Sequence, residues 1–162
     1  MRILVVYDSI HGNTKAIAES IGNSYDFDDE LVKVINVKNA DINNLKNIDL
    51  LIVGSPTIYF KPTAAIENFL DSIPVDGLKG IKVMAFDTRY SKVEMMEMVL
   101  KKLIKSFEYA AEPISEKLVK KGGKLITAPE GFIAKANKGP LHEGEIERAV
   151  AWAQNTVEDN MN

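Results

Sequence analysis

The chain has 162 residues, of which 46% are hydrophobic and 27% are charged, and its formal net charge is −3. This composition is typical of a globular protein with a full core and argues against a nucleic-acid-binding surface, while the absence of cysteine excludes disulfides and thiolate chemistry. No apolar run reaches the length of a membrane span or a signal-peptide core, so we expect one domain over residues 1–162, located in the cytoplasm and not inserted into a membrane.

Five short apolar runs predict β-strands, and they alternate with helical patterns along the chain. The runs are Ile3–Tyr7, Leu31–Val37, Leu50–Gly54, Ile81–Phe86 and Leu125–Ala128, with a resumption of the last at Phe132-Ile133. Three of them are nearly continuous apolar runs, as expected for strands that are covered on both faces. The alternation predicts an α/β fold with a parallel, doubly wound sheet.

Apolar residues at helical spacing predict the helices between these strands. The predicted helices are Asn13–Asn23, a short segment over Ile42–Ile48, Ala64–Ser72, Ile114–Lys121 and Glu143–Val157. A further amphipathic pattern covers Ser91–Tyr109. A right-handed crossover between parallel strands needs only one helix, so we assign the crossover to Ile114–Lys121 and treat Ser91–Tyr109 as an extra helix. Met95 and Met98 of that helix allow two interpretations. They form an adaptable surface for a redox partner or for a second copy of the chain, or they are ordinary side chains at the partly buried surface.

A hydroxyl-rich loop, Ser9–Thr14, joins the first strand to the first helix. The N-terminus of a helix carries unpaired backbone N–H groups and the positive end of the helix dipole, and both favour a phosphate. The alternative is an ordinary helix cap, in which Asn13 or Ser9 bonds the first turn and no ligand is present. The loop taken alone does not distinguish the two interpretations.

Two further loops follow the third and fourth strands, over residues 54–61 and 87–90. The carboxyl ends of parallel strands lie at one edge of a sheet, where ligands bind at the switch point of strand order. Phosphate donors would therefore meet aromatic and hydroxyl side chains at this edge. That combination favours a ligand with a phosphate at one end and a flat ring at the other. No metal site is predicted, because the chain has only two histidines.

At these loops the sequence resembles the flavodoxins and flavodoxin-like FMN proteins. The first loop matches the family signature Ser/Thr-x-x-Gly-Asn-Thr at Ser9, Gly12, Asn13 and Thr14. Gly54–Thr57 followed by Tyr59 resembles the second flavin loop, and Phe86–Arg89 resembles the third loop of one subgroup. Near the C-terminus, the residues Gly139–Leu141, Gly144-Glu145 and Trp152 resemble the C-terminal segment of that same subgroup. The resemblance covers nearly the whole chain except Ser91–Tyr109.

The resemblance implies a flavodoxin-like three-layer sandwich with noncovalently bound FMN and five parallel strands in the order 2-1-3-4-5. Ser9, Thr14 and the backbone N–H groups of His11, Gly12, Asn13 and Thr14 would hold the phosphate, and the His11 side chain would either bond it or cover the loop. The flavin ring would contact Pro56, Thr57, Ile58, Tyr59, Asp87, Thr88, Arg89 and Tyr90, with Tyr59 or Tyr90 stacked on a ring face. A carboxylate at Asp87 would lower the reduction potential, and an inward-pointing Arg89 would raise it.

The resemblance further implies a carrier of low-potential electrons between redox proteins, with no catalytic residue, because the flavin supplies the chemistry. The alternative is an FMN-dependent NAD(P)H:quinone oxidoreductase. The glycine-free segment Thr57–Lys61 favours that enzyme, because many carriers have a Gly there and positive φ costs other residues about 1–2 kcal/mol. A flavin-free interaction domain is a third hypothesis, although the third strand ends in Gly54-Ser55-Pro56 rather than in the acidic cluster of a receiver domain.

Overall fold

The computed structural model describes residues 1–25, 31–91, 109–135 and 138–161. Its strands are β1 (Ile3–Tyr7), β2 (Val32–Asn36), β3 (Leu50–Pro56), β4 (Lys82–Tyr90), β5 (Lys124–Leu125) and β6 (Glu130–Ala134). They form one parallel sheet in the order β2-β1-β3-β4-β5, and β6 also pairs with β4. The predicted strand order 2-1-3-4-5 is confirmed.

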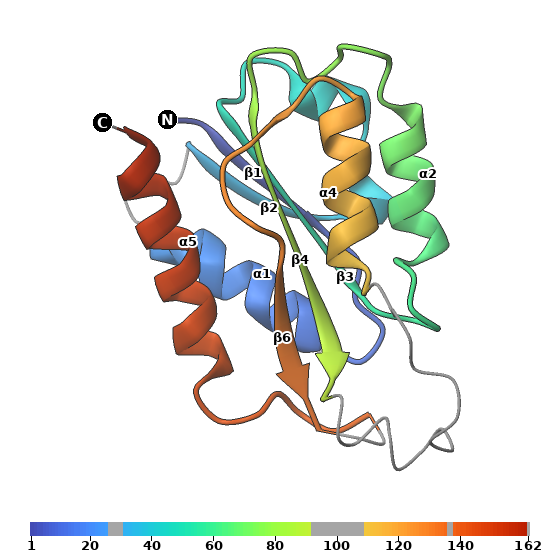
Figure 1. Cartoon of the computed structure of the whole chain (residues 1–162), viewed down its shortest axis with the longest axis vertical. Coiled ribbons are helices and arrows are strands. Elements are labelled where there is room, and N and C mark those ends of the chain that lie inside the picture. Colours follow the sequence, from blue (N-terminus) through green and yellow to red (C-terminus); the bar gives the residue numbers. More distant parts are fainter. Residues whose placement is uncertain (26–30, 92–108, 136–137, 162) are drawn as a thin grey trace.

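Helices cover both faces of the sheet, as Figure 1 shows. The helices α1 (Asn13–Ser24) and α5 (Glu145–Met161) lie on one face, and α2 (Ala64–Ser72) and α4 (Ala111–Lys120) lie on the other. Alternate residues of β1 supply the two cores: Leu4 and Val6 pack towards α2 and α4, whereas Val5 packs towards α1 and α5. The three-layer sandwich is therefore confirmed. None of the helices in the described ranges is long and apolar enough to cross a membrane.

The helix boundaries agree with the sequence patterns to within four residues, and α5 begins two residues after the predicted Glu143 and ends four residues after the predicted Val157. The helix α2 has the predicted bounds, and Thr63 caps it by accepting the Ile66 N–H. The crossover helix α4 begins three residues before the predicted Ile114, because Pro113 lies in its first turn, where a missing N–H costs nothing. The predicted extra helix over Ser91–Tyr109 falls almost wholly outside the described residues, and so does the homodimer through it.

The prediction that β4 ends at Phe86 is wrong, because the strand continues to Tyr90. Its last five residues pair in parallel with β6, in the register Phe86 with Glu130 to Tyr90 with Ala134. The fifth strand is therefore split into β5 and β6. The predicted resumption at Phe132-Ile133 is confirmed, but Ala128 belongs to neither piece. The third loop predicted from sequence is thus part of a strand.

The connection from β2 to β3 contains two short 3₁₀ turns in place of a full crossover helix. They are η1 (Val37–Asn39) and η2 (Ile42–Leu45), the second of which replaces the predicted segment Ile42–Ile48. Two side chains cap η2. The Asp41 carboxylate accepts the Asn43 N–H, and the Asn44 side-chain oxygen accepts the Asp41 N–H. A turn of this size covers less of the sheet than a helix does.

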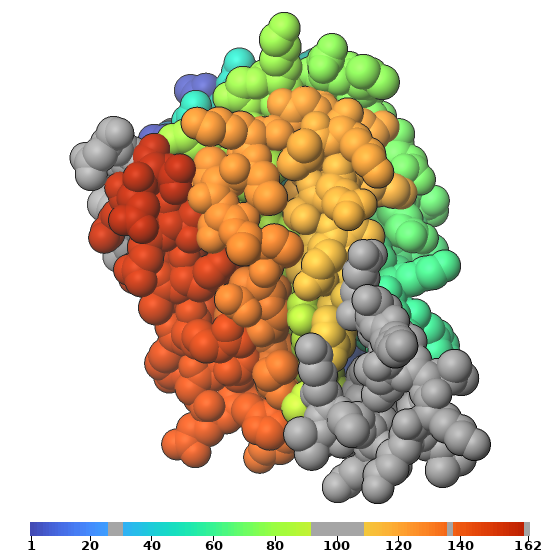
Figure 2. Space-filling model, in the orientation of Figure 1, coloured from blue at the N-terminus to red at the C-terminus, as the bar shows by residue number. Residues whose placement is uncertain are grey.

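The outer edge of β6 is closed by side chains of α5. The Glu145 carboxylate accepts the Ile133 N–H at 2.5 Å, and the Arg148 guanidinium donates to the Gly131 carbonyl at 2.5 Å. Arg148 also bonds Glu145, at 2.7 Å, and its guanidinium lies 4.6 Å from the Phe132 ring centroid. The segment that contains β6 lies at the surface between α4 and α5 (Figure 2). These bonds occupy backbone groups that an edge strand otherwise exposes.

We expect Glu145→Gln to lower the free energy of unfolding by about 1 kcal/mol at pH 7, since one charged hydrogen-bond acceptor is lost from a partly exposed site. Burial acts to raise the pKa of Glu145, but Arg148 and the Ile133 N–H outweigh it and hold that pKa below its usual range. A lowered pKa stabilises the fold above the unfolded-state value, about 4.3, and this contribution disappears as the pH falls through the folded-state value.

Urea unfolding at pH 7 and at pH 3 measures this effect. The difference between Glu145→Gln and the unchanged chain should shrink at the lower pH. Glu147→Gln, on the exposed side of the same helical turn, is the matched control and should change stability by less than about 0.5 kcal/mol. Equal losses for the two variants would contradict the role of the Glu145 carboxylate.

Candidate functional site

The carboxyl ends of β1, β3, β4 and β6 meet at one edge of the sheet, around a hollow of about 80 Å³. The residues that line it come from four separate parts of the sequence: His11, Asn13, Thr14, Pro56, Thr57, Ile58, Thr88, Arg89, Tyr90 and Ala134. Nine of these ten were predicted from the sequence. The hollow is too small to enclose a ligand of cofactor size, so such a ligand would lie across this edge of the sheet.

The first loop leaves a set of backbone N–H groups free at the start of α1. Gly12 precedes the helix with φ of 91°, and no side chain caps the first turn. Among the described residues, no acceptor bonds the N–H groups of Asn13, Thr14 and Lys15. A Cβ at Gly12 would meet nothing within 4 Å, so space does not require a glycine here. The positive φ angle does, because other residues adopt it only at a cost. The loop has the features of an anion site.

Side chains of the first loop hold it against its neighbours. The Ser9 hydroxyl oxygen accepts the Gly12 N–H at 3.1 Å, which leaves the hydroxyl proton available to an anion. The Asn13 amide donates to the Gly139 carbonyl at 2.9 Å. The hydroxyl oxygens of Thr14 and Thr88 lie 2.8 Å apart and are buried. The loop is thus fixed to β4 and to the segment before α5.

The second loop contains a tight turn at Ile58–Lys61. Ile58 and Lys61 exchange two backbone hydrogen bonds, of 2.9 and 3.0 Å, across Tyr59 and Phe60. Both central residues have positive φ, 47° and 66°, as in a type I′ turn. The sequence did not predict this backbone, because neither residue is the Gly, Asn or Asp that such a turn favours. Two bonds anchor the ends of the loop, from the Thr57 N–H to the Thr88 carbonyl and from the Thr63 N–H to the Ser55 hydroxyl.

We expect Tyr59→Gly to raise the free energy of unfolding of the ligand-free chain by about 0.5–1 kcal/mol, because glycine adopts positive φ without a Cβ clash. Tyr59 is 91% exposed, so its removal costs little packing. The matched control is Tyr59→Ala, which loses the same ring but keeps a Cβ and should give no gain. Thermal and urea unfolding of both variants measure the difference. Equal stability of the two variants would show that the turn is not strained at this residue.

A buried ion pair between Asp87 and Arg89 lies at the carboxyl end of β4. Arg89 donates to both carboxylate oxygens of Asp87 at 2.6 Å, and the Ala111 N–H at the start of α4 donates to the same carboxylate at 2.9 Å. The guanidinium carbon lies 3.8 Å from the Tyr109 ring centroid, and the side chain of Asp87 is fully buried. Burial raises the pKa of Asp87, while Arg89 and the Ala111 N–H act to lower it. The Asp87 carboxylate thus faces α4, on the other face of the sheet from the Thr88 hydroxyl.

Four predicted site residues do not line the hollow: Ser9, Gly12, Tyr59 and Asp87. Ser9 and Gly12 form the backbone of the first loop beside it. Tyr59 extends from the turn, largely exposed, and Asp87 is directed to the α4 face. Ala134 was missed, although the predicted resumption of the fifth strand at Phe132-Ile133 places its end at this edge. No group of three or more His, Cys, Asp or Glu residues in the described part of the chain could hold a metal ion.

A family model described as a flavodoxin domain matches residues 4–122. The chain belongs to the flavodoxin family. Proteins of this family bind flavin, usually FMN, and carry electrons to redox partners.

Solved structures of flavodoxins resemble the whole chain. A flavodoxin from the domain Archaea is 25% identical with a TM-score of 0.74, and each chain covers 100% of the other. Flavodoxin 2 from Bacillus cereus is also 25% identical with a TM-score of 0.75, over 98% of this chain and 99% of that one. Rubredoxin oxygen:oxidoreductase from Desulfovibrio gigas, 19% identical with a TM-score of 0.73, shares the fold over 98% of this chain but only 35% of its own. A search of curated sequences gave no significant match.

The residues at the edge of the sheet suit the flavin of the flavodoxin family. The free N–H groups at the start of α1 provide donors for a phosphate dianion without a lysine. Apolar and hydroxyl surfaces of Ile58, Thr57 and Tyr90 lie within the same hollow. Donors for the charged end and flat surfaces for a ring are thus combined at one site.

Proposed function

We propose that this chain binds FMN noncovalently at the carboxyl edge of the sheet and carries low-potential electrons between redox proteins. The observation that supports it most is the uncapped first turn of α1, with free N–H groups behind a glycine of positive φ. FMN would supply the electron chemistry when bound. The chain's residues would hold its phosphate and leave part of its ring accessible to a partner.

The proposed contacts divide between the loops. The backbone N–H groups of Asn13 and Thr14, together with the Ser9 hydroxyl, would hold the phosphate, and the exposed His11 imidazole lies at the rim. Pro56, Thr57 and Ile58 would face the ring, with Tyr90 as the aromatic residue inside the hollow. Tyr90 accepts the Lys138 N–H at 3.3 Å through its hydroxyl, which fixes the position of its ring. Tyr59, the other predicted stacking residue, does not line the hollow and is 91% exposed.

The experiment is a titration of the flavin-free full-length chain with FMN and with riboflavin, followed by flavin fluorescence. FMN should bind more tightly than riboflavin by about 100-fold or more, since only FMN carries the phosphate that the first loop would bond. Equal affinity for the two flavins, or no binding of either, would overturn the proposed site.

The second candidate function is an FMN-dependent NAD(P)H:quinone oxidoreductase. The observation that favours it is the glycine-free turn at Tyr59-Phe60, whose backbone angles are already positive. A glycine-free turn changes conformation less easily than the glycine-containing loop of many carriers. Anaerobic reduction distinguishes the two functions: rapid bleaching by NADPH supports the enzyme, whereas reduction only by a protein donor or dithionite supports the carrier.

A further inference from the structure

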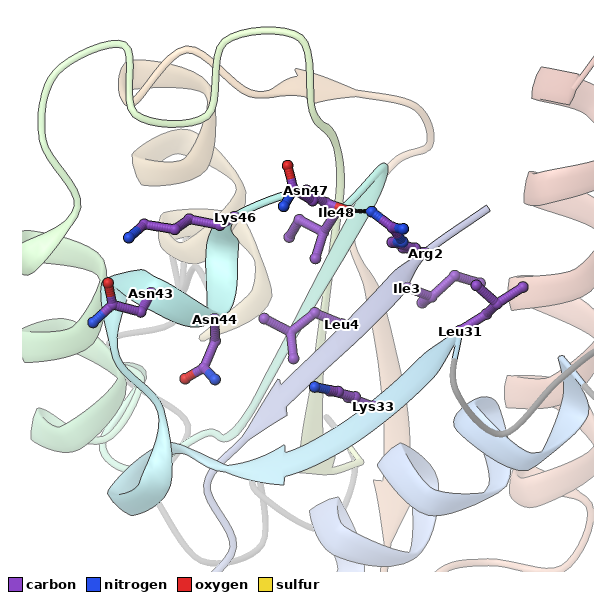
Figure 3. A pocket seen from close by; sticks show the side chains of 10 residues that line it. All are labelled: Arg2, Ile3, Leu4, Leu31, Lys33, Asn43, Asn44, Lys46, Asn47 and Ile48. Carbon is purple, nitrogen blue, oxygen red and sulfur yellow. Dashed lines mark hydrogen bonds between the residues drawn. The ribbon is translucent and has the colours of Figure 1, made fainter.

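A second and larger hollow, of about 360 Å³, lies at the amino ends of β1 and β2, at the edge of the sheet opposite the proposed flavin site. Figure 3 shows the residues that line it: Arg2, Ile3, Leu4, Leu31, Lys33, Asn43, Asn44, Lys46, Asn47 and Ile48. Its volume is within the range of small-molecule sites. No step of the proposed electron transfer uses it.

The hollow follows from the short connection between β2 and β3. Leu4 pairs with Lys33 across β1 and β2, so both side chains are on the face that α2 and α4 cover elsewhere. Among the described residues of the β2–β3 connection, the four-residue turn η2 lies beside this end of the sheet. Leu45 of that turn packs into the core, but Lys33 remains exposed beside Leu4. A full crossover helix would fill the same space.

The lining carries positive charge in a chain whose net charge is −3. Arg2, Lys33 and Lys46 contribute three cations, and none of the described residues that line the hollow is acidic. Neither lysine forms an ion pair with any residue in the described ranges. Two carboxylates lie nearby and each accepts a backbone N–H: Asp41 accepts that of Asn43, and Asp49 accepts that of Arg2.

The asparagines of η2 add neutral hydrogen-bond donors to these cations. The Asn44 side-chain oxygen accepts the Asp41 N–H at 2.8 Å, which leaves its amide nitrogen to donate elsewhere. In Figure 3 the polar ends of the Asn44 and Lys33 side chains face each other, below Leu4 in this view. Lys33 and Asn44 thus face one part of the hollow, and the half-buried Ile48 supplies apolar surface, since Leu4 is only 1% exposed.

We propose that this hollow binds a small organic anion, with one carboxylate, sulfonate or phosphate group on an apolar body. The anionic group would bond Lys33 and the Asn44 amide, Lys46 would reach it by turning its flexible stem, and the apolar body would lie against Ile48. Cations on flexible stems recognise such groups as point charges, and burial of the apolar body adds to the affinity. The site is independent of flavin.

The test titrates the full-length chain, at saturating FMN, with naphthalenesulfonate and with the uncharged naphthalenemethanol, followed by two-dimensional amide NMR. The sulfonate should bind with a Kd of about 1 mM or lower and shift the amides of Leu4, Lys33 and residues 43–48. Lys33→Gln/Lys46→Gln should weaken it about fivefold or more. Lys38→Gln/Lys124→Gln, which removes two exposed lysines outside the hollow, is the charge-matched control and should leave the Kd unchanged.

Three outcomes would overturn the proposal. They are equal affinity for the uncharged alcohol, shifts confined to the carboxyl edge of the sheet, and equal weakening by the two double variants. All four lysines are exposed, so the variants should keep the fold, which their own amide spectra would report. Failure of FMN to bind would contradict the proposed function. It would not affect the test of this hollow, because the amides that shift identify where the sulfonate binds.

Discussion

Ser9→Asp should weaken FMN binding by about 100-fold or more, equivalent to about 2.7 kcal/mol, and should leave riboflavin binding nearly unchanged. The Ser9 hydroxyl oxygen accepts the Gly12 N–H, and an Asp carboxylate can accept the same bond. The loop would therefore keep its form while gaining a negative charge beside the phosphate site. Two unit charges about 4 Å apart interact by about 4 kcal/mol near a protein surface, which is enough for the expected loss.

Fluorescence titration with both flavins measures this prediction, and Ser9→Asn is the matched control of the same size without charge. The control should lose less than about tenfold, because its side-chain oxygen can still accept the Gly12 N–H. Unfolding of the flavin-free Ser9→Asp chain should show equal or greater stability, since a carboxylate at the start of α1 suits the helix dipole. A parallel loss of affinity for riboflavin would indicate that the loop had changed shape and that phosphate repulsion was not the cause.

Arg89→Met should lower the free energy of unfolding at neutral pH by about 3–5 kcal/mol, the usual cost of leaving a buried charge unpaired. Asp87 is fully buried, and Arg89 supplies two of the three hydrogen bonds that the described residues donate to its carboxylate, at 2.6 Å each. After the substitution the Ala111 N–H would be the one remaining hydrogen-bond donor to this carboxylate among the described residues. Methionine keeps part of the apolar stem that packs beside Tyr109.

The pH dependence of the loss identifies its cause. Without Arg89, burial would raise the pKa of Asp87 further, so the folded chain would bind a proton that the unfolded chain, with a carboxyl pKa of about 3.9, has released. Stability of the variant relative to the unchanged chain should therefore fall as the pH rises through the raised pKa and recover as the pH decreases.

Urea unfolding between pH 5 and 8, with Asp87→Asn/Arg89→Met as the comparison, measures this dependence. The double variant removes the buried charge and should be more stable than Arg89→Met at pH 8. A loss that is the same at every pH and in both variants would mean that packing, and not the unpaired carboxylate, sets the cost.

The sequence alone determined the parts of this protein that depend on neighbours along the chain. The strand Ile3–Tyr7 and the helix Ala64–Ser72 have the predicted bounds, because a continuous apolar run or a capped amphipathic pattern fixes each one locally. The order of the strands was predicted through the family resemblance and is confirmed. The first loop was located in the same way, since Gly12 and the helix start are adjacent in sequence.

Only the tertiary structure decided the features that depend on residues distant in sequence. β4 continues to Tyr90 because β6, about 45 residues further on, pairs with its end, and this pairing directs Asp87 towards α4. The positive φ angles of Tyr59 and Phe60 oppose their own preferences and persist because the ends of their loop are bonded to Thr88 and Ser55. Local preference sets where an element begins, whereas strand pairing and loop anchoring set how far it runs and which way its side chains point.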